Sequence, residues 1–332
     1  MKRWTLMVVT GAFLMVLMGF AGPEPALAQQ PIVIKLGNVQ PADMPVNIGL
    51  RKFADIVAEK TKNQIQVQVF PASQLGTEQE ILEGVQLGTI HMFEGSTGSV
   101  GRFLAELEAF AAPYIWRDTD HMLKVVRGDI GNSLADRLVK AKGMRILDLG
   151  WLFGNRHLTT KAKAIYRPED LKGMKIRVQP TAIYLDTIRT MGANPTPMDW
   201  KEVYLGLQSG VIDGQENPPS VIYSAKLFEV QKYVMLTGHI TQNQAIVIND
   251  KFYQGLSAAL QKALLEATIE AGNFQNDLVV KQETIDLDRL KEKGMTVVQP
   301  DVTAFRAATK DVYKKFAEKW EPRFYERIQE VK

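Results

Sequence analysis

The stretch IVIKLGNVQPADMPVNIGLRKFADIVAEKTKNQIQVQVF, residues 32–70, contains two strand patterns separated by one helix pattern. Residues 32–36 are almost entirely β-branched or aliphatic, which is typical of a strand. Apolar residues then recur at spacings of four, three and four between positions 46 and 57, which places them on one face of a helix. Residues 64–70 alternate glutamine with apolar residues and predict a half-buried strand. The order strand, helix, strand indicates an α/β fold.

The same alternation continues along the chain. A short helix pattern over 77–87 leads to another apolar stretch around Ile90, so the first third reads β-α-β-α-β. A second series begins after Gly173. It comprises a strand over 174–178, a helix over 182–190, a strand over 194–196 and a helix from Asp199, with Glu202 completing a capping box. Alternating elements of this kind favour parallel sheets with helices on both faces.

The remaining segments predict further strands and helices. Residues 123–138 carry one apolar stripe of helical spacing. Residues 257–291 read as one long helix in which Gly272 would mark a bend. Short apolar runs predict strands over 144–149, 245–248 and 295–298, and charged amphipathic helices close the chain. Two α/β lobes in one chain have the broad shape of a solute-binding protein.

Composition excludes several classes of protein. The chain has 332 residues, 40 Lys and Arg against 37 Asp and Glu, a net charge of +3, four His and no Cys. The charge is too small and too evenly spread for a nucleic-acid binder. The absence of cysteine excludes disulfides, thiolate metal sites and thiol nucleophiles. No two histidines have the spacing that places both on one helix face for a metal, so no metal is expected.

The first 28 residues have the organisation of a secretory signal peptide. Lys2 and Arg3 form a positive start, an apolar run extends to Ala21, and residues 26–28 provide a small-x-small cleavage pattern. A retained membrane anchor is the alternative, because the apolar run reaches 18 residues. The cleavage pattern favours removal after Ala28. A secreted, Cys-free, soluble chain of this size suits a bacterial periplasm.

Known catalytic motifs are missing from the sequence. It contains no nucleophile elbow, no His-Glu-x-x-His and no Walker loop. The glycine-rich segment 95–101 either presents backbone N–H groups to an anion or forms a plain turn before a helix. Asp213 and Glu216 are close in sequence but have no recognisable acid or water-activating partner. A secreted hydrolase or lyase acting on an acidic substrate is the rival to a binding protein.

Two arginines are the residues best suited to bind an anion. Arg177 lies inside a short strand between apolar neighbours, which predicts a central position in the sheet, and Arg156 follows an apolar strand and Trp151. A guanidinium matches a carboxylate with two parallel hydrogen bonds. From composition alone, a surface or interlobe salt bridge is the simpler role for either arginine.

Several longer motifs resemble one family. These are RPEDLKGMKIRV at 167–178, MGANPTPMDWKEVYLGLQSGVIDGQENP at 191–218, FPASQLG at 70–76 and APY at 112–114. Together they identify the chain as resembling the DctP-like family of TRAP-transporter solute-binding proteins. The similarity spans essentially the whole mature chain.

The resemblance implies a two-lobed periplasmic-binding-protein fold, in which each lobe is a mostly parallel sheet flanked by helices and a long helix crosses both lobes. The expected lobes are residues 31–153 plus 243–282, and residues 154–242 plus 283–332. It also implies capture of an organic acid, closure about a hinge and delivery to the membrane permease of a TRAP transporter. The resemblance favours a monomer, with a dimer formed through a long C-terminal helix as the alternative. The protein would have no cofactor and would not be an enzyme.

The resemblance further implies a set of ligand-binding residues. Arg177 matches the family's main carboxylate clamp. Arg156 matches a second pocket arginine, although Asn155 and His157 flank it where the family usually has Thr or Ala and Gln. Asn217 matches a pocket amide, and Trp200 matches an aromatic residue that covers the ligand or packs in the core. The weaker candidates are Asn38, Glu78, Ser96 and Asn243.

The substrate stays open at this stage. Two arginines would grip both ends of a four-carbon dicarboxylate. One arginine with Trp200 and several amides would suit a sugar acid, and an aromatic or branched keto acid also fits. Sequence does not separate delivery to a permease from presentation to a membrane sensor.

Overall fold

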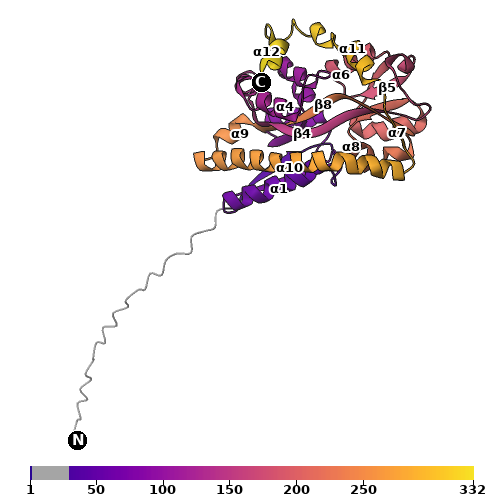
Figure 1. Ribbon diagram of the computed structural model, residues 1–332. Helices are drawn as coiled ribbons and strands as arrows, with labels where there is room; N and C mark the ends of the chain where they lie inside the picture. The colour runs from indigo at the N-terminus through magenta and orange to yellow at the C-terminus, as the bar shows by residue number, and fades with distance from the viewer. Residues whose placement is uncertain (2–29) are drawn as a thin grey trace. The chain divides into compact units, whose positions relative to one another are not determined.

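A nine-stranded mixed sheet runs through the described part of the chain, shown as a computed structural model in Figure 1. The structure describes Met1 and residues 30–332, so the predicted signal peptide lies outside the described residues. The strand order is β2-β1-β3-β8-β4-β7-β5-β6, with β9 paired to β8. Residues 31–332 form one unit.

The predicted strands and helices of both β-α series are confirmed, and each series supplies one side of the sheet. The sequence does not predict β7, the strand that ends the second series. In the first, β1 is parallel to β2 and β3, with Ile32 opposite Ile65. In the second, β5 is parallel to β6 and β7. The first series comprises β1 Ile32–Gly37, α1 Pro45–Lys60, β2 Ile65–Phe70, α2 Glu78–Leu87 and β3 Met92–Ser96. The second comprises β5 Lys175–Val178, α6 Ala182–Thr190, β6 Asn194–Pro197, α7 Val203–Ser209 and β7 Gly214–Asn217.

The centre of the sheet differs from the sequence prediction. The short strands expected there are parts of two 17-residue strands, β4 Met144–Thr160 and β8 Tyr233–Asn249. These two are antiparallel to each other, and β3 and β7 are antiparallel to them, so the sheet is mixed. Polar side chains occupy buried positions along both strands, for example Arg156 and Gln242. These polar residues interrupt the apolar pattern from which strand length is read.

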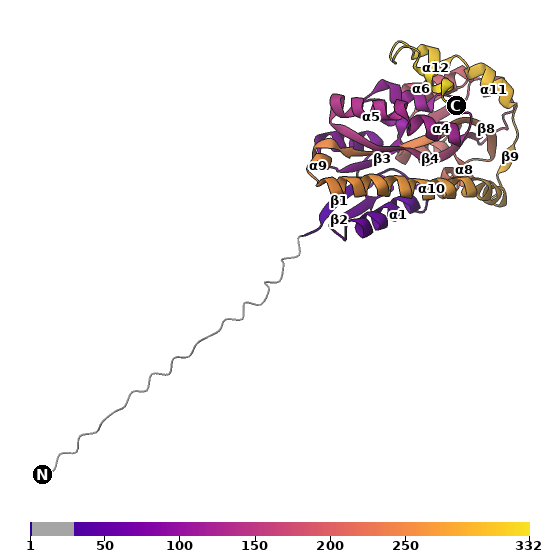
Figure 2. The same ribbon diagram turned by 60° about the vertical axis from the view of Figure 1, so that its left-hand side comes forward.

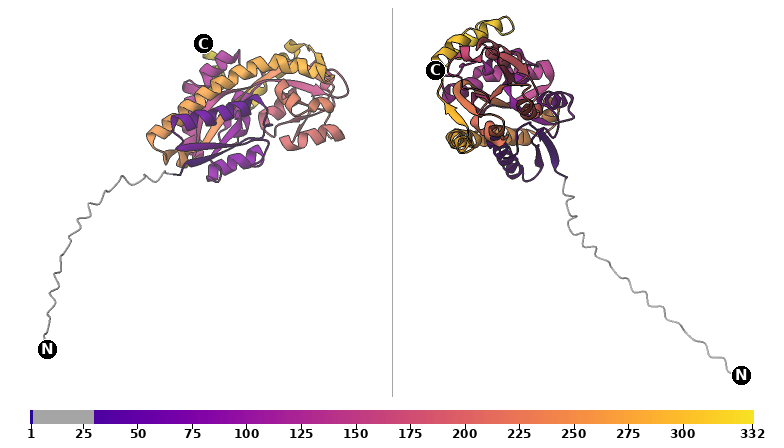
Figure 3. Two further views of the ribbon diagram at one scale, coloured as in Figure 1. Left: turned by 90° about the horizontal axis from the view of Figure 1, so that it is seen from below. Right: turned by 90° about the vertical axis from the view of Figure 1, so that its right-hand side faces the viewer.

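The long helix is confirmed as α10 Ala258–Glu292, and it continues through Gly272 without a break. It packs against α1, β4 and α8 Pro219–Ser224, and it lies beside α1 in Figures 1, 2 and 3. A Cβ at Gly272 would lie 2.7 Å from Nε1 of Trp151. The glycine therefore allows close packing of the helix on the sheet.

Gly272→Ala is expected to lower the free energy of unfolding by about 1–3 kcal/mol, the range for overpacking a filled core. An ordinary glycine-to-alanine change inside a helix instead raises the free energy of unfolding. Thr284→Ala, at an exposed position of the same helix, is the control and should be close to neutral. Urea unfolding measures both. A Gly272→Ala variant that is as stable as the parent would contradict this role for the glycine.

Two further helix predictions are wrong in detail. The single stripe over 123–138 is split into α4 Thr119–Val126 and α5 Asp129–Lys142, because Gly128 and Gly131 let the chain turn against the end of α4. Asp199 makes no side-chain capping bond, and a short 3-10 turn, η3 Trp200–Glu202, precedes α7. The remaining elements are α3 Thr97–Val100, η1 Ala105–Ala111, η2 Pro168–Leu171, η4 Leu227–Glu229, α9 Asp250–Gln254, β9 Thr296–Val298, α11 Val302–Thr309, η5 Val312–Lys315 and α12 Phe324–Glu330.

Within the described residues, no helix combines the length and apolar character needed to cross a membrane.

Candidate functional site

A pocket of about 540 Å³, including the solvent at its mouth, lies where the two β-α series face each other. Its walls come from loops after β1, β2 and β5, from the starts of α2 and η3, and from the end of β7. Parallel strands present their carboxyl ends at one edge of a sheet, and ligands bind there in open α/β folds. The lining residues are Val39, Gln40, Ser73, Thr77, Glu78, Gln79, Ser99, Arg102, Arg177, Gln179, Pro180, Asp199, Trp200, Lys201 and Asn217.

Arg177 is the cation best prepared to receive an anion in this pocket. Strand β5 carries it to the pocket wall, where it is only 2% exposed. Nε donates to the carbonyl of Met198 at 3.0 Å, which fixes the guanidinium. Its two terminal nitrogens have no hydrogen-bond partner among the described residues. Burial and the nearby charge of Arg156 lower the pKa of Arg177 to about 10, so the group remains charged at neutral pH.

Trp200 lines the pocket and also packs against the core. The guanidinium carbon of Arg177 lies 5.5 Å from the centre of its ring, within the range of a cation–π contact. The side chain is partly buried against all three apolar clusters of the fold. Trp200 therefore has contacts for either expected role, covering the ligand from the pocket wall or packing in the core. One face of its indole ring contacts the Arg177 guanidinium.

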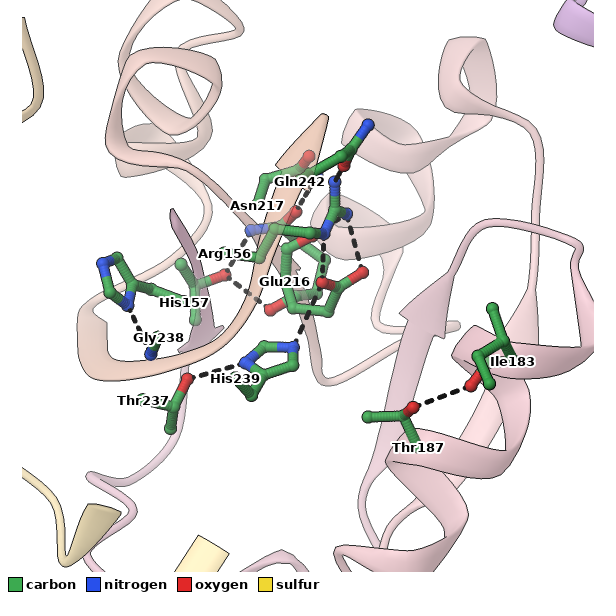
Figure 4. A network of polar contacts seen from close by, with 12 residues as sticks. Arg156, His157, Ile183, Thr187, Glu216, Asn217, Thr237, Gly238, His239 and Gln242 are labelled. Atoms are coloured by element: carbon green, nitrogen blue, oxygen red, sulfur yellow. Dashed lines mark hydrogen bonds and ion pairs between the residues drawn. The ribbon is translucent and has the colours of Figure 1, made fainter. Parts of the chain in front are cut away.

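Arg156 lies outside the pocket lining, in a fully buried ion pair with Glu216 (Figure 4). Nε contacts one carboxylate oxygen, and Nη2 donates to the other at 2.7 Å and to the backbone carbonyl of Glu216 at 2.6 Å. Nη1 donates to Oε1 of Gln242 on β8. The pair thus ties β4 to β7 and β8, and every nitrogen of the guanidinium is engaged within the protein.

The charge of Glu216 is stabilised from two sides. Burial opposes its ionisation, but the charge and hydrogen bonds of Arg156 outweigh burial and hold the pKa near 2. His239 lies 3.3 Å from the same carboxylate, and burial lowers the pKa of that imidazole. Asn217, the next residue on β7, lines the pocket and donates to Gln215 at 2.6 Å. The ion pair therefore holds the strand that presents Asn217.

Glu78 brings an acid to the opposite wall. It is the first residue of α2, after the capping Thr77, and Ser99 donates its hydroxyl to the carboxylate. Burial raises the pKa of Glu78, while the Ser99 hydrogen bond and the charge of Arg177 act in the other direction.

The other predicted site residues support the walls without lining them. Asn38 donates to Asn47 at 2.8 Å and accepts from the backbone of Gln40, and so shapes the loop after β1. Ser96 caps α3 by accepting from Gly98, so the glycine-rich segment forms a turn into a short helix. Asn243 donates to the carbonyl of Leu149 at 2.8 Å. Arg177, Asn217, Trp200 and Glu78 are the predicted residues that the fold brings together around the pocket.

Sequence reasoning missed most of the lining, and three of the missed residues are instructive. Gln179 lies two positions after Arg177, so the period of a strand could have placed both side chains on one face. Gln40 follows the end of β1, an edge where ligands bind. Arg102 spans the pocket mouth, donating to Gln79 at 2.6 Å and to the carbonyl of Pro180 at 2.6 Å. An exposed arginine in a loop carries no sequence signal for such a bridge.

Nothing in the described part of the chain assembles a metal centre, since no group of three or more His, Cys, Asp or Glu residues is placed to hold an ion. Asp213, which is close to Glu216 in sequence, accepts a hydrogen bond from the backbone N–H of Lys175 at 2.7 Å.

A second buried acid lies on β3. Glu94 is fully buried, and neither of its carboxylate oxygens has a hydrogen-bond partner among the described residues. Burial, with the nearby Glu78 carboxylate, raises the pKa of Glu94 well above its ordinary value. The folded protein therefore keeps a proton on Glu94 over a pH range in which the unfolded chain has released it.

This protonation makes stability depend on pH. An unfolded glutamate ionises at about pH 4.3, so stability falls as pH rises from there to the raised pKa. Glu94→Gln removes this titration. Its unfolding free energy relative to the parent should increase with pH above about 4.3, by up to about 1.4 kcal/mol per unit. Urea unfolding at pH 5 and pH 8 measures the unfolding free energy of both proteins. The same difference between variant and parent at the two pH values would contradict the raised pKa of Glu94.

Sequence comparison places the chain among extracellular binding proteins. Residues 36–319 match the DctP family, described as bacterial extracellular solute-binding protein, family 7. The chain is 37% identical over 252 residues to the 2,3-diketo-L-gulonate-binding periplasmic protein of Escherichia coli, covering 76% of each chain.

Solved structures agree in fold. A TRAP periplasmic solute-binding protein from Actinobacillus succinogenes, with bound L-galactonate, has a TM-score of 0.86 and 35% identity, covering 90% of this chain and 98% of that one. Another, from Sulfurospirillum deleyianum with bound succinate, has a TM-score of 0.85 and 30% identity, covering 91% and 99%. The neighbours thus include one with a bound sugar acid and one with a bound dicarboxylate.

Proposed function

This chain belongs to family 7 of the bacterial extracellular solute-binding proteins, and from that premise we propose that it captures an organic acid and delivers it to the membrane permease of a TRAP transporter. Proteins of this family bind and carry solutes, so the chain is a binding protein and not an enzyme. The rival reading as a secreted hydrolase or lyase is thereby set aside.

Arg177 is the proposed carboxylate clamp, and its contacts carry the proposal. A buried guanidinium needs a partner for its remaining donors, and a buried carboxylate needs a paired cation. Arg177 has its Nε bound to Met198 and two terminal nitrogens at the pocket wall. A ligand carboxylate would accept from both in the bidentate geometry that suits Arg. Asn217 would donate to a further ligand oxygen.

We propose that the pocket closes between two lobes, residues 31–153 plus 243–282 and residues 154–242 plus 283–332. The proposed boundary follows the long central strands, where Gly154 pairs with Gln242 after a shift in register and has a φ of +120°. Lining residues from Val39 to Arg102 belong to the first lobe, and those from Arg177 to Asn217 belong to the second. A ligand that touches both lobes only when they are together would favour closure.

Arg102 would act as a latch in this mechanism, because its bond to Pro180 joins the proposed lobes. Arg102→Ala should speed ligand dissociation by about 2- to 12-fold, the equivalent of one hydrogen bond. Arg51→Ala is the matched control, since Arg51 donates to Ala42 within one lobe. Stopped-flow fluorescence gives both rates. Equal acceleration in the two variants would rule out the latch.

The proposed location is the periplasm, reached through a signal peptide cut after Ala28. Relatives of the family are periplasmic, which supports the proposal. Two further proposals follow from the same function: the protein works as a monomer, and its macromolecular partner is the membrane subunits of the permease. Mass analysis of the exported protein tests the cleavage.

Calorimetric titration of the purified protein tests the function. The protein is first unfolded and refolded to remove any co-purified ligand. A panel of monocarboxylates, dicarboxylates and sugar acids is then titrated, with sorbitol as a neutral polyol. At least one acid should bind with micromolar affinity or better while sorbitol does not. The absence of binding across all acids, or binding of sorbitol as tight as that of any acid, would overturn the proposal.

A further inference from the structure

Two pocket glutamines lack partners for their side-chain oxygens. Gln40 is 6% exposed and Gln179 is 8% exposed, and both line the pocket, one from each proposed lobe. Within the described residues, Oε1 of each has no hydrogen-bond donor. A buried acceptor without a donor is costly, because its hydration is lost and not replaced. Both oxygens are themselves buried, so a ligand that supplies hydroxyl donors would satisfy them once each amide turns toward the pocket.

The positive charge available to a ligand is limited to one guanidinium. Arg156 donates its hydrogen bonds to Glu216 and Gln242, and the opposite charges of Arg156 and Glu216 cancel within the buried pair. Arg102 spends its terminal donors on Gln79 and Pro180. Lys201 is exposed, so water screens its charge. Arg177 is therefore the pocket cation with an open fork, which suits one carboxylate.

The rest of the lining would repel a second carboxylate. Glu78 and Asp199 both line the pocket, and both favour the charged form of Arg177. A like charge brought into a partly buried site is disfavoured, whereas a hydroxyl can donate to a carboxylate or to an amide oxygen. The lining thus offers one open cationic fork and several oxygen acceptors.

We infer that the bound acid is a polyhydroxylated monocarboxylate, an aldonic or uronic acid, and that Gln40 and Gln179 are specificity residues that read its hydroxyl groups. The inference rests on the proposed function, since it assumes an acid held by Arg177. A site built to bond a hydroxyl strongly rejects the analogue that lacks it. Four-carbon dicarboxylates, which the sequence left open, are then poor ligands.

Calorimetric titration with acids of matched carbon skeleton tests the class. At four carbons the set is threonate and erythronate, tartrate, succinate and butanoate. At six carbons it is the aldonates and uronates, glucarate and hexanoate. The tightest aldonate or uronate should bind at least tenfold better than the dicarboxylate and the unhydroxylated acid of the same length.

The titrations distinguish failure of the polyhydroxylated-acid inference from failure of the proposed organic-acid function. If a dicarboxylate or an unhydroxylated acid binds tightest, the polyol class is wrong while the organic-acid function stands. If no acid in either set binds, both fail.

Substitution of the two glutamines tests their role. Gln40→Met and Gln179→Met keep the side-chain length and remove the amide. Each should weaken the best hydroxy acid at least fivefold and leave the weak binding of the matching unhydroxylated acid unchanged. Gln74→Met, at an exposed position outside the lining, is the control and should behave as the parent. Equal loss for both acids in a glutamine variant would mean that the residue only supports the wall, and would overturn its assignment.

Discussion

Replacing Arg177 by alanine is expected to weaken binding of the organic acid by about 2–5 kcal/mol, which is the range for truncating one partner of a buried charge pair. At 25 °C this corresponds to a rise in Kd of about 30- to 4,000-fold. The physical reason is that the ligand carboxylate would enter the same buried wall without its cation. Titration of parent and variant with the best acid from the panel measures the loss.

Arg177→Lys separates charge from geometry. Lysine keeps a positive charge but lacks the planar fork, so it should recover only part of the affinity. The thermal unfolding midpoint of each ligand-free variant serves as a check on folding. An alanine variant that folds and binds within about twofold of the parent, well below the tenfold that 1.4 kcal/mol represents, would remove Arg177 from the clamp.

The second large effect is expected at the Arg156–Glu216 pair. Glu216→Gln leaves a fully buried guanidinium without its counter-charge, and breaking a buried pair in this way lowers stability by about 3–5 kcal/mol. Denaturant unfolding at neutral pH measures the difference. The change should also weaken ligand binding, because β7 presents Asn217 beside the pair.

A double variant and a pH series test the origin of that loss. Arg156→Met combined with Glu216→Met removes both charges and should be more stable than Glu216→Gln alone. The folded pKa of Glu216 lies near 2, below that of an unfolded glutamate. The stabilisation is therefore complete above about pH 4.3 and is lost as pH falls toward 2. If Glu216→Gln changes stability by less than about 1 kcal/mol, the pair contributes less than a buried ion pair should.

Membership of the same family does not by itself select the ligand. The two solved relatives with bound L-galactonate and bound succinate have nearly the same fold similarity to this chain. Differences in ligand must therefore arise from a few side chains on a common frame. In this chain Arg156 is engaged by Glu216 and Gln242, which leaves Arg177 as the open fork and favours a single carboxylate.

The local pattern of the sequence was sufficient for the outer parts of the sheet. Residues 32–70 and 174–196 carry clear periods of two and of 3.6, because in these segments one face is buried and the other is not. Such periods come from each element's own contact with the core. The long helix over 258–292 was readable for the same reason, and the motif at 191–218 was enough to identify the family.

The sequence predicted the two central strands as too short, because their apolar pattern is broken where polar side chains pair with each other. Glu216 lies 60 residues after Arg156 in the sequence, and Gln242 lies 86 residues after it. The three side chains meet only across β4, β7 and β8. No local period encodes such a partner. The role of Gly272 is set in the same way, because its close neighbour Trp151 lies on another element.

The sequence by itself determined the order of strands and helices over residues 32–87 and 174–196, the family and the presence of two arginines suited to an acid. Only the tertiary structure decided which arginine has open donors. That depends on distances between strands that are remote in the chain, where Glu216 neutralises Arg156 and Met198 binds only Nε of Arg177. Hydrogen bonds form over about 3 Å, so a residue's chemistry is set by neighbours that only folding supplies.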